Sequence, residues 1–444
     1  MDELFAPFGE TVLGTIRAEL FFASSRSPTR SRQAFFRLYP PYLLVRSYFE
    51  RRPRRDVPAG DPFFLFVSDY AAESGFGTIQ PLLNLAPRSV LVANRAVLRQ
   101  RRGELPEGVA VIDADADLPA RYWGDFYCRA ESDFRLVMDV TPTRLRPAIT
   151  AARHLIKVLL SRAYAYERMF VGLFEANQHI KGVVTHNDFS ALNHLAGLCA
   201  RRFRVPDFTL QHGFPTQEHF PVTASRCCIW GSRFVKTMVE NGTPPERLVI
   251  TGAPRLDRLW DYRSNKAAGS GSKPQKILYL SQGHSQLLSE LQHKSVLSLL
   301  GTFRHDPERE VVVRLHPQES KRAVRAMRKV LPEIQHSEGM SLASDLSRAG
   351  VVLCAGSTAM LEAMILGVPV IEIRPFPHTD CGRPFEAILQ VSTANDLIHA
   401  VNRLDDAAFR GGILEQQDAL LGEYIFAPGN GAEKTWNYIE KSVG

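Results

Sequence analysis

The chain has 444 residues, of which 45% are hydrophobic and 23% are charged. This is the composition of a globular protein with room for two domains, and it excludes a disordered or fibrous chain. No apolar run is long enough to cross a bilayer and the chain does not open with a secretory signal, so we expect a cytoplasmic protein.

The formal net charge is +7, and arginines crowd the first 60 residues. This region predicts anionic partners such as phosphates, an acidic polymer or the inner face of the cytoplasmic membrane, with a solvated basic surface as the alternative. Zinc-finger, RNP and basic-zipper patterns are missing from the sequence, so we expect no nucleic-acid partner. The six cysteines form no C-x-x-C pair, which favours free thiols over disulfides or a zinc site.

Residues 1–60 read as an Arg-rich helical or irregular extension, and residues 61–262 as a first domain. Within this domain, helices are expected at 148–179, 189–202 and 232–241. Apolar strands are expected at 63–67, 89–93, 109–112, 182–185, 208–210, 227–230 and 248–250. The alternation of strands with helices predicts a mostly parallel sheet that is covered on both faces.

Residues 263–275 form a polar linker, because most of this segment lacks an apolar side chain larger than alanine. A second alternation over 276–444 predicts another domain, with strands at 277–280, 311–315, 351–354 and 368–371 and helices at 285–300, 319–330 and 357–366. The expected fold class is therefore α/β, with two Rossmann-like domains whose parallel sheets face each other across a cleft.

The richest polar pattern follows the expected strand 351–354. Gly356 permits close backbone approach, and Ser357 and Thr358 offer hydroxyls at a helix start that favours anions. Glu362 lies one turn deeper on the same face, where a carboxylate could accept hydrogen bonds from a ribose diol. An ordinary N-cap with Glu362 on a solvated face is the alternative. We favour a ligand, because the apolar neighbours of Glu362 indicate a buried helix, where a carboxylate needs a partner.

Two other strand ends of the second half predict phosphate contacts. Arg314 and His316 lie at the end of one strand, and Pro317 holds His316 in an extended conformation, so both side chains could bind a phosphate. The first strand of this half runs into a loop of small residues with Ser281 and Gly283, which could cradle a pyrophosphate.

In the first half, His212 follows one strand, and His186 and Asp188 follow another. A base that takes a proton from an acceptor hydroxyl works best with a pKa near neutrality, as histidine has. We therefore predict catalytic roles for these three residues. A loop after the first strand is expected to face the cleft and to contact the acceptor through Asp69, Ser74, Gly75 and Gly77.

The ordered set Gln211-His212-Gly213, Gly252-Ala253-Pro254-Arg255-Leu256-Asp257, Arg314-Leu315-His316-Pro317 and Ser357-Thr358 with Glu362 resembles known enzymes. It is similar to the CDP-glycerol glycerophosphotransferases of teichoic acid synthesis and to bacterial capsule and lipopolysaccharide transferases that use CMP-sialic acid or CMP-Kdo. The resemblance implies a GT-B fold, with the acceptor on the N-terminal domain and the nucleotide on the C-terminal one. It further implies that His316, Pro317, Ser357 and Thr358 contact a cytidine nucleotide, that Glu362 binds ribose and that His212 is the base.

The resulting hypothesis is a metal-independent glycosyltransferase, or a glycerophosphotransferase-like enzyme, that needs no cofactor. It would take a sugar from a CMP- or CDP-linked donor, with UDP-linked donors as the alternative, and pass it to a hydroxyl of a cell-surface glycan or glycolipid. A GT-A transferase that binds metal through Asp113, Asp115 and Asp117 is disfavoured, because one sheet cannot easily absorb both halves of the chain, so these aspartates are expected in a loop. Two alternatives stay open, a nonhydrolysing UDP-N-acetylglucosamine 2-epimerase and a non-catalytic scaffold on membrane or polymer.

Overall fold

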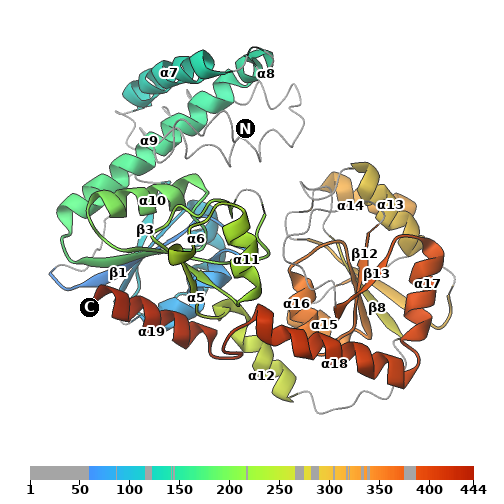
Figure 1. Ribbon diagram of the computed structural model, residues 1–444. Helices are drawn as coiled ribbons and strands as arrows, with labels where there is room; N and C mark the ends of the chain where they lie inside the picture. Colours follow the sequence, from blue (N-terminus) through green and yellow to red (C-terminus); the bar gives the residue numbers. More distant parts are fainter. Residues whose placement is uncertain are drawn as a thin grey trace.

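The chain folds into two α/β lobes that lie side by side in a computed structural model (Figure 1). The structure describes residues 60–86, 88–115, 123–141, 143, 146–216, 219–265, 275–281, 290–303, 306–316, 319, 321–331, 335–337, 341–374 and 387–444. The Arg-rich extension, Gly283, Pro317, Asp117 and most of the expected linker lie outside these residues.

The first lobe is built on a seven-stranded parallel sheet in the order β3-β2-β1-β4-β5-β6-β7. The apolar residues of its central strands are buried on both faces, as expected for parallel strands covered by helices, whereas the two edge strands are partly exposed. The strands are β1 (Phe63–Ser68), β2 (Ser89–Ala93), β3 (Ala110–Asp113), β4 (Ile180–Thr185), β5 (Asp207–Leu210), β6 (Arg226–Ile229) and β7 (Leu248–Ile250). The covering helices include α5 (Phe76–Leu85), α6 (Arg95–Arg101), α10 (Ala191–Arg202) and α11 (Arg233–Glu240).

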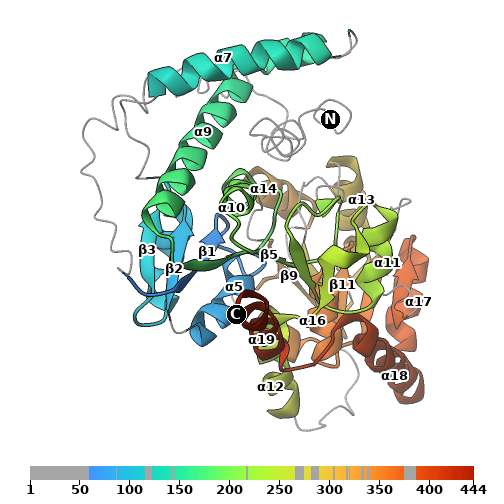
Figure 2. The same ribbon diagram turned by 60° about the vertical axis from the view of Figure 1, so that its left-hand side comes forward.

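A helical arm projects from this lobe (Figures 1 and 2). It consists of α7 (Trp123–Val140), the short α8 (Arg146–Ala151) and the 24-residue α9 (Arg153–Ala176). Helix α9 confirms most of the predicted 148–179 segment, whereas α7 was not predicted. A signal for α7 was present in the sequence, because its buried apolar side chains recur at helical spacing: Phe126, Ala130, Phe134 and Val137.

The second lobe has a six-stranded parallel sheet in the order β10-β9-β8-β11-β12-β13. The strands are β8 (Lys276–Leu280), β9 (Glu310–Arg314), β10 (Gln335–His336), β11 (Val351–Cys354), β12 (Val370–Ile373) and β13 (Leu389–Val391). The two edge strands β10 and β13 were missed because such short, partly polar segments carry no clear period. The helices are α13 (Glu290–Leu300), α14 (Lys321–Val330), α15 (Leu342–Arg348), α16 (Ala359–Ile365), α17 (Ala394–Arg403) and α18 (Ala407–Tyr424).

The C-terminal helix α19 (Gly431–Val443) corrects the expected extent of the second domain, 276–444. It crosses back and packs against α5 and the short helix η7 (Pro254–Leu256) of the first lobe. The Trp436 ring meets Phe64 of β1 at 4.7 Å between centroids, and the Asp257 carboxylate accepts the Gly431 and Ala432 N–H groups at 2.9 and 2.7 Å. An amphipathic pattern does not reveal which sheet a helix covers, so the sequence alone did not show that α19 returns to the first lobe.

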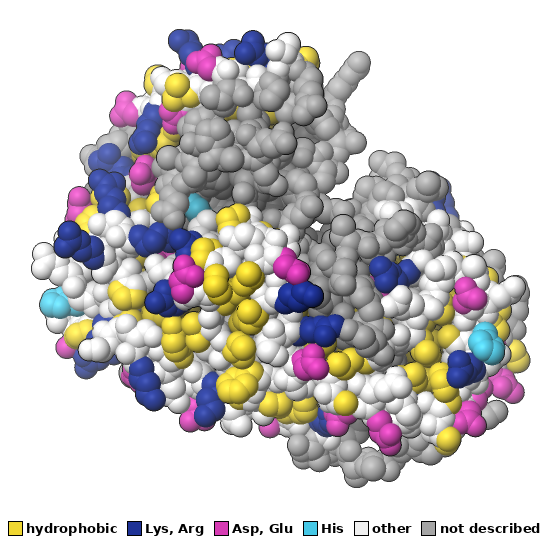
Figure 3. Space-filling view, in the orientation of Figure 1, with side chains coloured by type: hydrophobic (Ala, Val, Ile, Leu, Met, Phe, Trp, Pro, Cys, Tyr) yellow, Lys and Arg dark blue, Asp and Glu magenta, His cyan; other side chains and the backbone are white. Residues whose placement is uncertain are grey.

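Among the residues that the structure describes, no helix has both the length and the apolar character of a membrane span. On the face seen in Figure 3, basic and acidic side chains are interspersed over the described surface. The expected contact with an anionic membrane falls on the N-terminal extension, which lies outside the described residues, so it stays a prediction.

Candidate active site

Three strand ends of the second sheet lie level with one another. Leu280, the last residue of β8, is in register with Arg314 of β9 on one side and with Cys354 of β11 on the other. Parallel strands end at the same edge of their sheet, where ligands bind in open α/β domains. The predicted polar segments that start at Ser281, Arg314 and Gly356 are therefore brought to one edge, as the sequence predicted.

A carboxylate that the sequence reading overlooked joins two of these segments. Glu319 accepts a hydrogen bond from the Ser281 hydroxyl at 2.9 Å and another from the His316 backbone N–H at 3.1 Å. Burial raises the pKa of Glu319, and the two hydrogen bonds oppose that rise. Burial also lowers the pKa of His316, which favours the neutral imidazole. Glu319 thus fixes the loop positions from which Ser281 and His316 could contact a ligand.

Arg314 has a protein partner at this edge. Its guanidinium pairs with the carboxylate of Asp345, whose side chain is only 5% exposed, and Arg348 approaches the same carboxylate at 3.3 Å. Ser337 donates a hydrogen bond to it as well. The predicted phosphate contact of Arg314 stays a prediction, and any such contact would have to share the arginine with Asp345.

The turn before α16 reaches the first lobe. Gly356 has a φ of +87°, a left-handed conformation that glycine adopts without strain. Ser357 accepts the Ala359 N–H at 3.2 Å, whereas Thr358 makes no side-chain cap to its own helix. Instead, the Thr358 hydroxyl accepts the backbone N–H of Phe214 at 3.0 Å. Of the two hydroxyls considered for the alternative, an ordinary N-cap, only Ser357 bonds to a backbone N–H of the helix start, and Thr358 ties the segment after His212 to the second lobe.

Glu362 is buried as predicted, and its partner is an arginine from the first lobe. Arg255 of η7 approaches the Glu362 carboxylate at 3.1 Å, and the two side chains are 6% and 12% exposed. The sequence pattern required a partner for this carboxylate and favoured a ligand, whereas the structure provides Arg255, so ribose binding by Glu362 stays a prediction. A signal was available, because an arginine between Pro254 and Leu256 in an apolar surrounding also needs a partner.

A cluster of histidines lies at the strand ends of the first sheet. His212, after β5, stacks on His219 with 4.9 Å between ring centroids and meets His186, after β4, edge-on at 6.1 Å. Phe189 packs against both His219 and His212, at 4.8 and 6.0 Å. The predicted pair His186 and His212 is thus brought together, and His219 is an addition that the sequence reading did not make.

The electrostatic surroundings keep the central imidazoles neutral. Burial lowers the pKa of His212 well below its ordinary value, and the neighbouring His219, His186 and Arg255 lower it further. Burial also lowers the pKa of His186, against the opposing effects of the Asp69 carboxylate and the Val67 carbonyl. A neutral imidazole can accept a proton, but a pKa below the neutral range makes His212 a weaker base than the sequence predicted, and its catalytic role stays a prediction.

The predicted acceptor residues separate into two groups. Asp69 lies beside the histidines, with an oxygen 3.5 Å from His186 Nε2 and a hydrogen bond of 3.0 Å from Asn193. The expected loop over Ser74, Gly75 and Gly77 is instead a turn that leads into α5, whose first residue is Phe76. A Cβ atom on Gly75 would lie 2.3 Å from the Tyr70 carbonyl oxygen, and one on Gly77 2.5 Å from Glu73. The backbone contact explains Gly75 by packing, whereas the Glu73 carboxylate near Gly77 is the end of a flexible side chain that can move away. Acceptor contact at Ser74, Gly75 and Gly77 stays a prediction.

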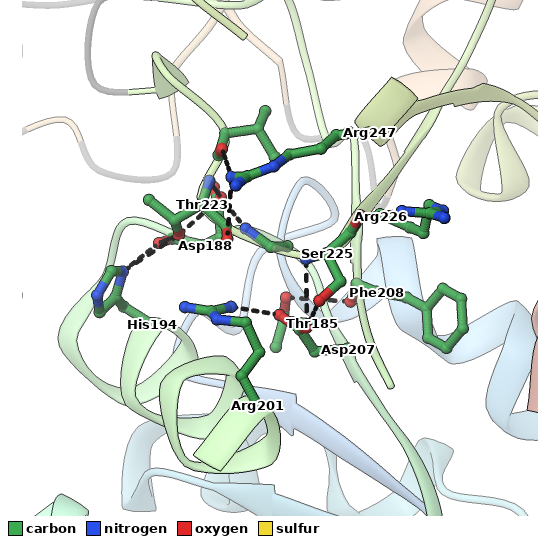
Figure 4. A network of polar contacts seen from close by, with 12 residues as sticks. Thr185, Asp188, His194, Arg201, Asp207, Phe208, Thr223, Ser225, Arg226 and Arg247 are labelled. Carbon is green, nitrogen blue, oxygen red and sulfur yellow. Dashed lines mark hydrogen bonds and ion pairs between the residues drawn. The ribbon is translucent and has the colours of Figure 1, made fainter. Parts of the chain in front are cut away.

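Asp188 holds the far end of the segment that carries His219 (Figure 4). Its carboxylate accepts the backbone N–H and hydroxyl of Thr223 at 2.5 and 3.0 Å and the N–H of Ala224 at 3.1 Å. Next to it, the buried Asp207 accepts hydrogen bonds from Ser225 and Arg201. The contacts of Asp188 are therefore those of a structural anchor, and its predicted catalytic role stays untested.

Gln211 fixes the near end of the same segment. The Gln211 side-chain oxygen accepts the Trp230 backbone N–H at 2.9 Å, and the side-chain NH2 donates to the Gly213 carbonyl at 3.0 Å. The backbone carbonyl of Gln211 accepts the Trp230 indole N–H at 2.7 Å. A cavity of about 20 Å³, enough for about one water molecule, is lined by residues that include Gln211, His212 and His219. The segment that carries His212 is therefore held at both ends, and His212 lies beside this small cavity.

The described residues contain no group of histidine, cysteine and acidic side chains arranged to hold a metal. Of the aspartates considered for a metal-binding Asp-x-Asp motif, Asp113 pairs with Arg95 at 3.3 Å, and Asp115 accepts the Arg95 N–H at 2.9 Å and the Tyr166 hydroxyl at 3.2 Å. These two carboxylates therefore serve the packing of β3 against α6 and α9.

Neither a protein-family model nor a curated protein matches the sequence. Among solved structures, S. aureus MnaA in complex with UDP superposes with a TM-score of 0.55 at 14% identity, covering 86% of this chain and 97% of that one. The UDP-GlcNAc 2-epimerase from Neisseria meningitidis bound to UDP-GlcNAc superposes with a TM-score of 0.52 at 13% identity, covering 85% and 99%. The wall teichoic acid polymerase TagF matches 94% of this chain at 11% identity, but its TM-score of 0.49 supports no argument. With two parallel-sheet lobes and a C-terminal helix that returns to the first, the chain has the GT-B fold.

Proposed function

We propose that the protein is a glycosyltransferase that takes a sugar from a nucleotide-activated donor, of cytidine type by preference, and passes it to a glycan or glycolipid hydroxyl. One observation carries this proposal. The Phe214 N–H bonds to the Thr358 hydroxyl at 3.0 Å, so the segment that bears His212 meets the turn from which Thr358 would contact a nucleotide. A base and a donor site on opposite lobes thus adjoin one another, as transfer between two bound substrates requires.

In this proposal the second lobe binds the donor. Ser357, Thr358 and His316 would surround the phosphates, and Glu362 would accept hydrogen bonds from the ribose. Glu319 would act as a positioning residue, because it orients Ser281 and the His316 backbone. The fold agrees with this role, since two similar structures hold UDP or UDP-GlcNAc.

The first lobe would activate the acceptor. The neutral imidazole of His212 takes the proton of an acceptor hydroxyl while that oxygen forms a bond to the donor's anomeric carbon. The bond between this carbon and the phosphate oxygen breaks, and the nucleotide leaves with the bonding electron pair. Hydrogen-bond donors around the phosphates stabilise the charge that develops on this leaving group.

A second candidate is an epimerase that interconverts nucleotide sugars without an acceptor. It is favoured by the fold similarity to the UDP-GlcNAc 2-epimerase of Neisseria meningitidis. Incubation of the enzyme with UDP-GlcNAc alone separates the candidates. If a 2-epimer forms without any acceptor, the protein is an epimerase and not a transferase. A transferase instead requires an added glycan and releases a nucleotide.

Nucleotide binding is tested first with a thermal-shift panel of CMP, CDP, UDP, GDP and ADP. A ligand at 100 times its dissociation constant adds about 2.7 kcal/mol to the free energy of unfolding. We expect the largest shift with a cytidine nucleotide and a reduced shift in the His316→Ala variant. If none of these nucleotides stabilises the native protein, the proposed function is wrong.

A further inference from the structure

The ion pair between Arg255 and Glu362 joins the two lobes at the centre of the candidate site. Arg255 belongs to η7, which leads from β7 to the end of the first lobe, and Glu362 to the first turn of α16. Their closest atoms, Arg255 Nη1 and Glu362 Oε1, are 3.1 Å apart, and both side chains are almost completely buried. A buried pair of this kind is costly to break unless each charge finds another partner.

Arg255 has more hydrogen-bonding capacity than Glu362 uses. Its Nε is buried and has no hydrogen-bond partner among the described residues, although the side chain is only 6% exposed. A guanidinium offers five N–H donors in a planar fork that fits the oxygens of a phosphate. A buried donor without an acceptor is uncommon and costly, so this side chain points to an acceptor that the described residues do not supply.

Arg255 also lies within reach of the acceptor side of the site. Its guanidinium carbon is 5.2 Å from the centre of the Trp230 ring, and its positive charge contributes to the lowered pKa of His212. The groups that face His212 are thus His186 and His219 from its own lobe, Asp69 beyond His186, and the Arg255–Glu362 pair towards the second lobe. An anion bound at Arg255 would therefore lie between the histidine cluster and α16.

We propose that Arg255 and Glu362 recognise a nucleoside phosphate as a unit, by exchanging their ion pair for a phosphate on Arg255 and a ribose diol on Glu362. This inference rests on the proposed function and names the chemistry that its donor must carry. A nucleoside phosphate satisfies both buried charges at once. A nucleoside by itself, or inorganic phosphate, satisfies one charge and leaves the other buried without its partner.

The exchange makes the donor site selective for the intact nucleotide. Because each half-ligand must separate the ion pair without replacing it, cytidine and phosphate should bind far more weakly than the sum of their contacts predicts. The exchange also places one phosphate contact on the lobe that carries His212, so the donor would bind to both lobes.

The test measures, by calorimetry, the dissociation constants of five ligands, which are CMP, cytidine, UMP, uridine and inorganic phosphate. The proteins are the native chain, Arg255→Gln and Glu362→Gln. In Arg255→Gln the carboxylate is free, so we expect nucleosides to bind more tightly and the ratio of the nucleoside to nucleotide dissociation constants to fall by about tenfold or more. In Glu362→Gln the guanidinium is free, so we expect inorganic phosphate to bind more tightly and nucleosides more weakly.

The matched control is Arg233→Gln. Arg233 of α11 approaches Glu423 of α18 at 3.5 Å, with both side chains exposed, so this variant removes an ion pair away from the histidines. It should leave the dissociation constants of all five ligands unchanged within about twofold, as exposed pairs contribute little. Urea unfolding of each variant shows whether it is folded, and Glu362→Gln tests the exchange by itself if Arg255→Gln does not fold.

Two results would overturn the exchange in different ways. If the native protein binds CMP or UMP but neither variant changes the nucleoside to nucleotide ratio or the affinity for phosphate, the exchange is wrong and the proposed function stands. If the native protein binds no nucleotide, both proposals fall together.

Discussion

The two lobes use the ends of their parallel strands differently. In the first lobe, the side chains that follow β4 and β5 turn towards one another and form the cluster of His186, His212 and His219. In the second lobe, the polar groups that follow β8 and β9 are engaged by protein carboxylates, Glu319 and Asp345. The first arrangement suits proton transfer and the second suits a pre-oriented binding surface. In the proposed function, the carboxyl ends of the strands therefore provide proton transfer in one lobe and binding in the other, according to which groups pair there.

Replacement of the central histidine, His212, should have the largest effect, because it should lower the turnover number far more than the nucleotide affinity. We expect His212→Asn to lower the turnover number about 10²- to 10⁴-fold, because the general base is lost. Nucleotide affinity should change by less than about threefold, since His212 itself is not among the proposed donor contacts. Single-turnover transfer assays and calorimetry measure the two quantities. Equal losses of affinity and turnover would show that His212 belongs to the donor site.

Loss of the anchor behind the histidine cluster should be the next largest effect. Asp188→Ala leaves the Thr223 and Ala224 donors without their buried acceptor, so we expect the free energy of unfolding to fall by about 3 kcal/mol. Urea denaturation measures this change. Asp188→Asn keeps one acceptor oxygen and should lose less. An unchanged stability together with lost turnover would instead assign Asp188 the catalytic role that the sequence predicted.

The corresponding carboxylate of the second lobe should matter less for stability. Glu319→Gln keeps the shape of the side chain but weakens the hydrogen bonds from Ser281 and His316, so we expect a loss of about 1 kcal/mol in the free energy of unfolding. Nucleotide affinity should fall about threefold, because the loops that carry Ser281 and His316 are less well positioned. A change in turnover without a change in affinity would contradict a purely positioning role.

The smallest expected effect is a shift in pH dependence. Because the pKa of His212 is lowered, its base form persists below the usual histidine range, and kcat/KM should fall only as the pH drops through that lowered pKa. His219→Phe keeps an aromatic ring against His212 but removes a charge that lowers its pKa, so the acidic limb should move to higher pH. The pH profile of kcat/KM measures this shift. An acidic limb that does not move would show that His219 has no influence on the reacting base.

The sequence by itself determined much of the framework. Buried apolar runs that alternate with amphipathic helices gave two parallel sheets, and the main strands lie within about two residues of their predicted positions. Turn-forming and small residues also marked the strand ends, so His186, His212, Ser281 and Arg314 were correctly placed at the sheet edges. These features are local, because a strand's period and its terminating residues are encoded within a few positions of one another.

Only the tertiary structure decided which polar groups meet. Arg255 and Glu362 are 107 positions apart, Phe214 and Thr358 are 144 apart, and the pairing of each depends on how the two lobes dock. The return of α19 to the first lobe, with Trp436 on Phe64, is equally invisible to a local pattern. The sequence shows that a buried charge needs a partner, but the identity of that partner depends on packing between segments that lie far apart in the chain.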